Sequence, residues 1–166
     1  MGSSDTISAF ELVSLSGGSN DGNLTCWRGR GRRGVFVVRG GGNVRSWNGI
    51  QYRTGLSAKN VNARQLSMNV ATIPPGGVAA AHIHVDFEVM LYILEGRVRH
   101  EYGPGLESVV ENQAGDFIFI EPGVPHEVFN LSDTEPVVAV VARSDASEWE
   151  HIIPYRRPAG SSSAPR

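Results

Sequence analysis

The chain has 166 residues, which is enough for one domain with a hydrophobic core and too few for two domains of ordinary size. Its 15 lysine and arginine residues against 17 aspartate and glutamate residues leave a formal net charge of −2. A charge this close to zero gives no reason to expect nucleic acid or an anionic membrane as a partner, so small molecules and other protein chains remain.

Glycine and proline interrupt the sequence at short intervals. The chain has 20 glycines and 9 prolines, and its apolar residues come in short runs, a pattern typical of many short strands joined by turns. All-β is therefore the predicted fold class. The single cysteine, Cys26, cannot form an internal disulfide, and neither a secretory signal nor an apolar run of membrane-spanning length is found, so a cytoplasmic protein is expected.

Residues 1–34 are rich in glycine, serine, asparagine and arginine, and carry few apolar groups to offset the entropy of ordering. They predict a flexible N-terminal segment. Arginines in a glycine-rich context could contact RNA, but no series of aromatic residues accompanies them, and a solvated basic run is the interpretation we favour. These arginines are Arg28, Arg30, Arg32 and Arg33.

Strand-like runs follow one another over residues 35–155, separated by turn sequences such as GPG, AGD and PGVP. In one run Leu66, Met68 and Val70 alternate with polar neighbours, as in a half-buried strand. Many short strands at near-regular spacing indicate one barrel or sandwich domain. Residues 144–152 predict a short helix, and 156–166 a disordered tail. The predicted strands are 35–39, an arm around 47–52, 64–73, 87–94, 97–102, 107–112, 116–121, 126–131 and 137–143.

Two histidines, His82 and His84, stand one residue apart in the sequence HIH. On a strand this spacing sends both rings to the same face, about 7 Å apart along the backbone. Core packing gives no reason for such a pair, because each nitrogen of a buried imidazole needs a hydrogen-bond partner. A third histidine, His126, follows a tight turn and could be brought across a barrel to complete a metal site.

Two segments around these histidines resemble the two sequence motifs of the cupin family. The resemblance implies a single-domain cupin, which is a double-stranded β-helix or jelly-roll barrel, over residues 35–155 with an extended N-terminal arm. It also implies a homodimer, in which the arm at 35–39 could add to a neighbour's sheet. The matching residues are Gly76, His82, His84, Glu88 and Gly96 in the first motif, and Gly115, Pro122, Gly123, His126 and Asn130 in the second.

One departure from the family pattern affects the site. Seven residues instead of six separate Glu88 from Gly96, so the two ends of the first motif disagree about which residue faces inward. Counted from His84, Glu88 points into the barrel with the histidines. Counted back from Gly96, the inward place falls on Val89 and Glu88 points away, unless a bulge intervenes.

The fourth metal ligand therefore has two candidates. In cupins the glutamate of the first motif often completes a site of three histidines and one glutamate, and here that residue would be Glu88. His100, on the inward-facing parity of the next strand, is the rival. We favour four histidines, His82, His84, His126 and His100, with Glu88 as the catalytic base. His100 as an ordinary strand residue, and a metal-free barrel with structural histidines, are the alternatives.

A finer resemblance is carried by residues 52–77, 91–107 and 115–145. These stretches look like a branch of small single-domain cupins that includes the aromatic polyketide cyclase of resistomycin biosynthesis. This resemblance implies a divalent metal ion, zinc by preference with iron, manganese, nickel or copper as alternatives, that chelates a poly-β-keto chain. Glu88 would remove a proton between two carbonyls, and aldol-type cyclisation with loss of water would follow. The predicted partner is an apolar, polyketide-like small molecule. A dioxygenase and a non-catalytic small-molecule- or metal-binding cupin are the alternatives.

Overall fold

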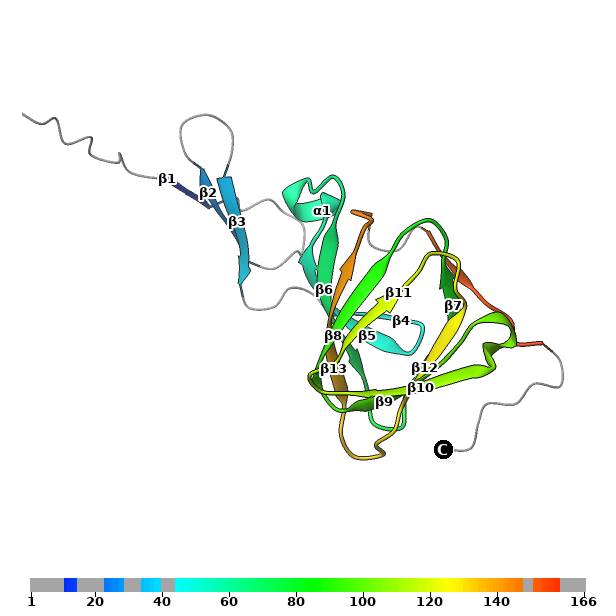
Figure 1. Cartoon of the computed structure of the whole chain (residues 1–166). Helices are drawn as coiled ribbons and strands as arrows, with labels where there is room; N and C mark the ends of the chain where they lie inside the picture. Colours follow the sequence, from blue (N-terminus) through cyan, green and yellow to red (C-terminus); the bar gives the residue numbers. More distant parts are fainter. Residues whose placement is uncertain (1–10, 15–22, 29–33, 40–43, 148–150, 159–166) are drawn as a thin grey trace, which may run out of the picture. The chain divides into compact units, whose positions relative to one another are not determined.

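The computed structural model describes residues 11–14, 23–28, 34–39, 44–147 and 151–158. The chain divides into two units, residues 1–43 and 44–166, and each unit is described by itself. In the first unit three strands pair antiparallel in chain order, which makes a small meander (Figure 1). These strands are β1 (Glu11–Ser14), β2 (Asn23–Arg28) and β3 (Gly34–Arg39).

This meander differs from the expected flexible segment. The composition of residues 1–34 predicts no structure there, whereas β1 and β2 lie within that range, β3 pairs with β2, and the second unit begins only at Val44. Composition averaged over the whole segment hides the local runs NLTCWR and GVFVVR, in which β-branched and aromatic residues favour strands. Three of the four arginines, Arg30, Arg32 and Arg33, lie outside the described residues.

The second unit consists of two antiparallel sheets around a common interior (Figure 1). This arrangement confirms the predicted all-β, jelly-roll fold. The five-stranded sheet has the order β10-β9-β12-β7-β14, formed by β7 (Val78–His84), β9 (Arg97–Tyr102), β10 (Ser108–Gln113), β12 (His126–Asn130) and β14 (Ile152–Pro154). The six-stranded sheet has the order β11-β8-β13-β6-β5-β4, formed by β4 (Val44–Trp47), β5 (Ile50–Leu56), β6 (Ser67–Ile73), β8 (Val89–Glu95), β11 (Phe117–Ile120) and β13 (Val137–Arg143).

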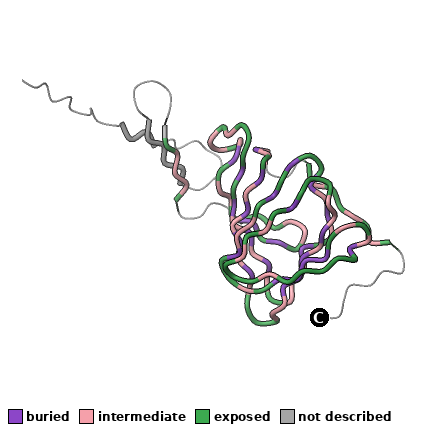
Figure 2. The backbone as a smooth tube through the Cα atoms, in the orientation of Figure 1, coloured by how far each residue is buried: buried purple, intermediate pink, exposed green. Residues whose placement is uncertain are grey.

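Burial alternates along β6 and β13, so one face of the six-stranded sheet meets the interior (Figure 2). In β13 the inward residues are Val137, Ala139, Val141 and Arg143. The core that forms between the sheets is therefore largely aliphatic. The end of β7, the start of β12 and the end of β13 contribute residues that line the same interior cavity.

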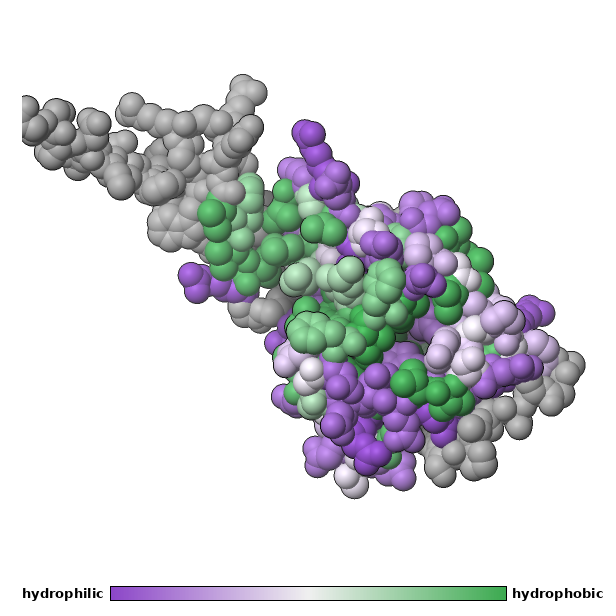
Figure 3. All heavy atoms as spheres, viewed as in Figure 1, coloured by the Kyte–Doolittle hydropathy of each residue, from purple (hydrophilic) through white to green (hydrophobic). Residues whose placement is uncertain are grey.

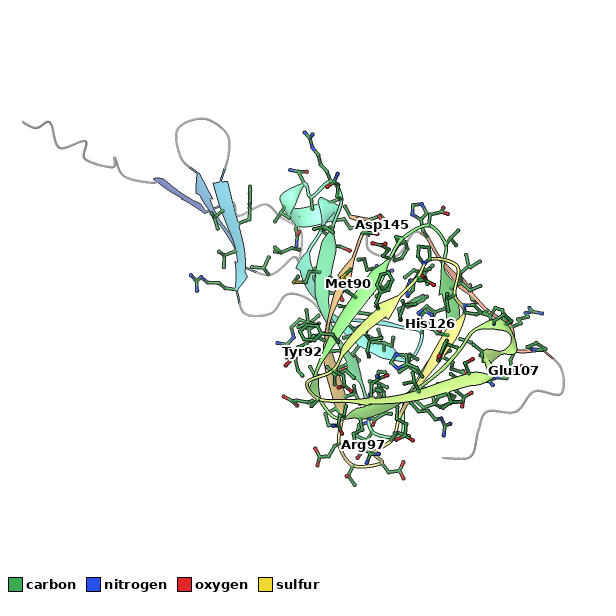
Figure 4. All side chains as sticks on the ribbon, in the orientation of Figure 1. Met90, Tyr92, Arg97, Glu107, His126 and Asp145 are labelled. Carbon is green, nitrogen blue, oxygen red and sulfur yellow. The ribbon has the colours of Figure 1, made fainter. Side chains whose placement is uncertain are left out.

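In β6 the residues that face the interior are not those that the apolar alternation predicts. Met68 is 49% exposed, whereas Ser67 and Asn69 are buried. Met68 and Met90 both pair with Ala142, so they share the outer face of the six-stranded sheet. Figure 3 shows apolar side chains gathered on this face, and Figure 4 labels Met90 on it. Because both faces of the sheet carry apolar groups, alternation alone does not identify the core face.

Two further differences concern short segments. A one-turn helix, α1 (Ala58–Val61), begins after the N-cap Ser57. The sequence pattern did not predict this helix. Of the predicted helix at 144–152, residues 148–150 lie outside the described part, and the remaining residues are not helical. The tail expected to be disordered from residue 156 is held by Arg157, which pairs with Glu101 at 2.6 Å and with Glu127 at 2.5 Å.

Within the described residues, no helix has the length and apolar character needed to cross a bilayer.

Candidate metal centre

The three predicted histidines meet in the interior of the second unit. His82 and His84 lie at the end of β7, and His126 is the first residue of β12. The antiparallel register of these strands pairs His126 with His82, which brings the two motifs together. All three side chains are buried, and their nearest ligand atoms lie within 4.8 Å of one another. Figure 4 shows His126 between the two sheets.

The three rings form a compact triangle. Their centroids are 4.3 Å apart for His82 and His126, 4.9 Å for His82 and His84, and 5.0 Å for His84 and His126. The Nδ1 atoms of His82 and His126 lie 2.8 Å and 3.0 Å from the carbonyl oxygens of Ala80 and Val124. A backbone carbonyl accepts only from a protonated Nδ1, so each ring keeps its Nε2 lone pair for an ion.

Burial keeps these imidazoles neutral. It is the main cause that lowers the pKa of His82 to about 3 and that of His84 to about 2, and the charges of neighbouring histidines contribute to both shifts. Burial also lowers the pKa of His126, although its hydrogen bond to Val124 opposes the shift. Neutral imidazole is the form that binds a divalent ion, so the cluster is ready to coordinate at neutral pH.

The imidazoles line a mainly apolar cavity between the sheets, with a volume of about 70 Å³. One water needs roughly 10–15 Å³ of such volume, so the cavity has room for a small molecule beside an ion. Its lining residues come from both sheets: Ile50, Tyr52, Ala71, Ile73, Ala79, His82, His84, Val89, Leu91, Ile93, Val98, His100, Ile118, Ile120, His126, Val128, Val137, Ala139, Val141 and Arg143.

His100 lines the same cavity from β9 but is not one of the three residues in the compact cluster. Its Nδ1 lies 3.1 Å from Oδ1 of Asn112, and its Nε2 is buried without a hydrogen-bond partner among the described residues. Burial is the main cause that lowers the pKa of His100 to about 4. The structure thus places a fourth neutral imidazole beside the cluster, with a lone pair available in the cavity.

Glu88, the expected catalytic base, lies outside the cavity. Its side chain is exposed, and its backbone N–H donates to Oγ of Ser144 at 2.9 Å. Val89 takes the inward place instead and is only 2% exposed. The non-strand residues between β7 and β8 break the parity that was counted forward from His84, so the count back from Gly96 describes the observed strand. The base role expected for Glu88 has no support from this geometry.

Two cavity residues, Arg143 and Tyr52, were missed by the sequence analysis. Arg143 ends β13 on the same parity as Val137, Ala139 and Val141, so the run VVAVVAR already contained the signal that its guanidinium faces inward. An arginine at the end of a strand is usually solvated, so its charge argues against the inward place that the strand parity indicates. Tyr52 was expected within an arm and lies instead in the core strand β5.

Fold and site together define a jelly-roll barrel that carries a candidate metal centre of three histidines. Residues 69–143 match the family model described as a cupin domain.

Solved structures give the same result for the fold. The chain is similar to an oxalate decarboxylase of Lactobacillus farciminis in complex with formate, at 20% identity and a TM-score of 0.58, over 68% of this chain and 33% of that chain. It is also similar to the Cnp3 cupin domain of Schizosaccharomyces pombe, at 11% identity and a TM-score of 0.56, over 69% and 79% of the two chains.

A third similar structure is the oxalate decarboxylase of Bacillus subtilis, described with Mn(II) centres, at 19% identity and a TM-score of 0.57, over 68% and 29% of the two chains. This chain therefore spans about a third of the length of these decarboxylases. At such identities the likenesses show the fold alone. No curated protein sequence matches the chain.

Proposed function

We propose that the protein is a metal-dependent enzyme that acts on a small, oxygen-chelating substrate inside the barrel. The observation that carries the proposal is the cluster of three buried, neutral imidazoles, with a fourth imidazole in the same cavity. A divalent ion held by His82, His84 and His126 would supply Lewis-acid polarisation of substrate oxygens. The cluster fits several ions: zinc is our preference, and manganese is named for a structurally similar decarboxylase.

Two adjoining cavities suggest how a longer substrate could be accommodated. The inner cavity of about 70 Å³ shares four residues, His100, His126, Ile118 and Ile120, with a second cavity of about 560 Å³. The second cavity is lined by the turn at Gly103 and by partly exposed residues that include Phe119. The reacting carbonyl groups of a substrate would occupy the inner cavity, and the rest of the chain would extend into the outer one.

The specific reaction that we propose is aldol-type cyclisation and dehydration of a poly-β-keto chain, the activity implied by the sequence resemblance. It needs a base to take the proton between two carbonyls, and His100 replaces Glu88 in that role. The contact between Nδ1 of His100 and Oδ1 of Asn112 favours the tautomer with an available Nε2 lone pair. The apolar wall would exclude water and restrict the folding of the chain.

A second candidate is a dioxygenase acting on a small chelating substrate. The observation that favours it is the weakness of the base nearest the cluster: burial is the main cause that lowers the pKa of His100 to about 4, and no aspartate or glutamate is among the described residues that line the inner cavity. Oxygen chemistry at an open metal site does not require a strong protein base. A non-catalytic small-molecule-binding cupin is the outcome if neither reaction is found.

The test uses metal-stripped protein reloaded separately with zinc, manganese or iron(II). A synthetic β-polyketone is incubated with each form in air and under anaerobic conditions. The cyclase proposal predicts ring formation that depends on metal and not on oxygen, whereas the dioxygenase predicts substrate loss with oxygen uptake. Full-rate cyclisation by the stripped protein would contradict the proposal.

The homodimer and the cytoplasmic location remain predictions from the sequence.

A further inference from the structure

The inner cavity contains a buried positive charge that the proposed reaction does not use. Arg143 is only 2% exposed, and its side chain lines the cavity together with the imidazole cluster. None of the described residues that line this cavity is an aspartate or a glutamate. A guanidinium loses much of its hydration energy on burial, so its place in an apolar chamber points to a role in binding.

Tyr52 accompanies this charge. It is 4% exposed, and the guanidinium carbon of Arg143 lies 5.5 Å from the centroid of its ring. Burial raises the pKa of the Tyr52 phenol, and the charge and hydrogen bond of Arg143 offset this only in part. The phenol therefore stays protonated and remains a donor. Both residues line the cavity from the six-stranded sheet, and together a guanidinium and a phenol carry several N–H and O–H donors.

The opposite wall carries the imidazole cluster. Arg143 belongs to the six-stranded sheet, and the cluster belongs to the five-stranded sheet. The positive charge of Arg143 is felt across the cavity, since it adds to burial and the neighbouring histidines in lowering the pKa of His82 and of His84. With an ion bound at the cluster, the cavity would hold two cationic groups facing each other, an arrangement complementary to an anion with two oxygen-bearing ends.

We propose that Arg143 and Tyr52 bind the carboxylate of the substrate, while a second oxygen group of the same molecule reaches the imidazole cluster. The substrate class is then a small carboxylic acid with a neighbouring oxygen function, such as a β-keto acid or a β-dicarboxylate, or a longer chain that ends in such a group. This inference rests on the proposed function for the second contact only. The anion contact with Arg143 stands without the metal.

The size of the cavity agrees with this class. At roughly 10–15 Å³ for each water, a volume of about 70 Å³ corresponds to about five to seven waters, which matches an acid of three or four carbons. The planar guanidinium suits a carboxylate, which accepts two parallel hydrogen bonds from it.

The experiment compares malonate with malonamide, which has the same carbon skeleton and no charge. Binding of each is measured by isothermal titration calorimetry to the metal-stripped protein and to the zinc-loaded protein. In the stripped protein, malonate is expected to bind about tenfold or more tightly than malonamide, because a hydrogen-bonded charge pair is gained. Malonamide binding as tightly as malonate would overturn the proposal without the need for any variant.

Two variants locate the contact. Arg143→Met keeps the length of the side chain and removes the charge, and Arg143→Lys keeps the charge and removes the planar fork. Malonate affinity should fall about tenfold or more in Arg143→Met and recover in part in Arg143→Lys, with malonamide unchanged. A folded Arg143→Met protein that keeps malonate affinity overturns the proposal, and so does the same result for Tyr52→Phe if Arg143→Met does not fold.

Zinc content is measured on every variant. Loss of malonate binding with zinc binding retained assigns the anion to Arg143 and leaves the metal centre intact. Zinc binding that is already absent from the wild-type protein would contradict the proposed function alone, because the malonate comparison in stripped protein remains valid.

Discussion

Arg143 lies directly opposite Val89 in the antiparallel pair of β13 and β8, and both side chains face the cavity. The family pattern, counted back from Gly96, places the inward residue of the first motif at Val89. This chain therefore has an apolar residue at that place and a cation beside it. The interior is more positive than a cavity with an inward glutamate would be, which favours an anionic ligand.

Val89→Glu should restore a carboxylate ligand to the cavity. The new side chain would face the imidazole cluster from β8, and Arg143 would offset part of the cost of burying its charge. We expect zinc affinity to rise by about tenfold, measured by competition with a chromogenic chelator, and malonate binding to fall. Val89→Gln is the matched control, which has the same shape without the charge. Equal zinc affinity for both variants would contradict the expectation.

Glu88→Gln should leave zinc content and turnover within about twofold of the wild-type values, as surface substitutions usually do. The side chain is exposed and does not belong to the cavity lining, while the backbone contacts with Ser144 do not depend on the carboxylate. Turnover and zinc content are measured on the same preparation. A large loss of turnover with unchanged zinc would show that Glu88 reaches the substrate after all.

His100→Gln distinguishes a base from a fourth ligand. As a base, His100 contributes only to the chemical step, so turnover should fall by about a hundredfold or more while zinc content stays the same. As a ligand, its loss would lower zinc affinity and turnover together. Asn112→Ala is the companion variant, since it removes the contact at Nδ1 and leaves the imidazole in place. A clear loss of zinc in His100→Gln would favour the four-histidine site.

Acid should destabilise the metal-free protein. The folded-state pKa values of His82 and His100, about 3 and about 4, lie below the ordinary value of 6.5 because of burial. As pH falls below 6.5, the unfolded chain gains protons that the folded chain does not, so the free energy of unfolding falls. The slope approaches about 1.4 kcal/mol per pH unit for each such imidazole, and it vanishes above pH 7 or so.

Urea denaturation at a series of pH values between about 7.5 and 4.5 measures this dependence. His100→Gln should flatten the curve, because one of the buried imidazoles is removed. A metal-free wild-type protein whose stability does not change across this range would contradict the burial of neutral histidines.

The sequence predicted the elements that are governed by local patterns. The strands β9 and β13 have the expected bounds, and the three histidines His82, His84 and His126 meet as the two motifs imply. The parity of a strand was the weak point. Strand period specifies which residues share a face, but an irregular loop resets the phase, as it does before Val89.

Choosing the buried face of a two-sided apolar strand also needs tertiary context. Met68 is exposed because β6 packs its other face against the interior. The sequence of β6 alone does not determine which of its two faces is buried. For Arg143 the strand parity predicts an inward side chain, whereas its charge predicts a solvated one, and the structure follows the parity. Residues that break a local rule in this way are frequent at binding sites.

The most direct test of the metal centre is the metal content of the purified wild-type protein after equilibration with zinc and removal of the excess, compared with that of His84→Ala and His126→Ala. Inductively coupled plasma mass spectrometry should find about one ion per wild-type chain and a small fraction of that in either folded variant, because three imidazoles are needed for tight binding. Equal zinc in all three proteins, or none in the wild type, would contradict the account.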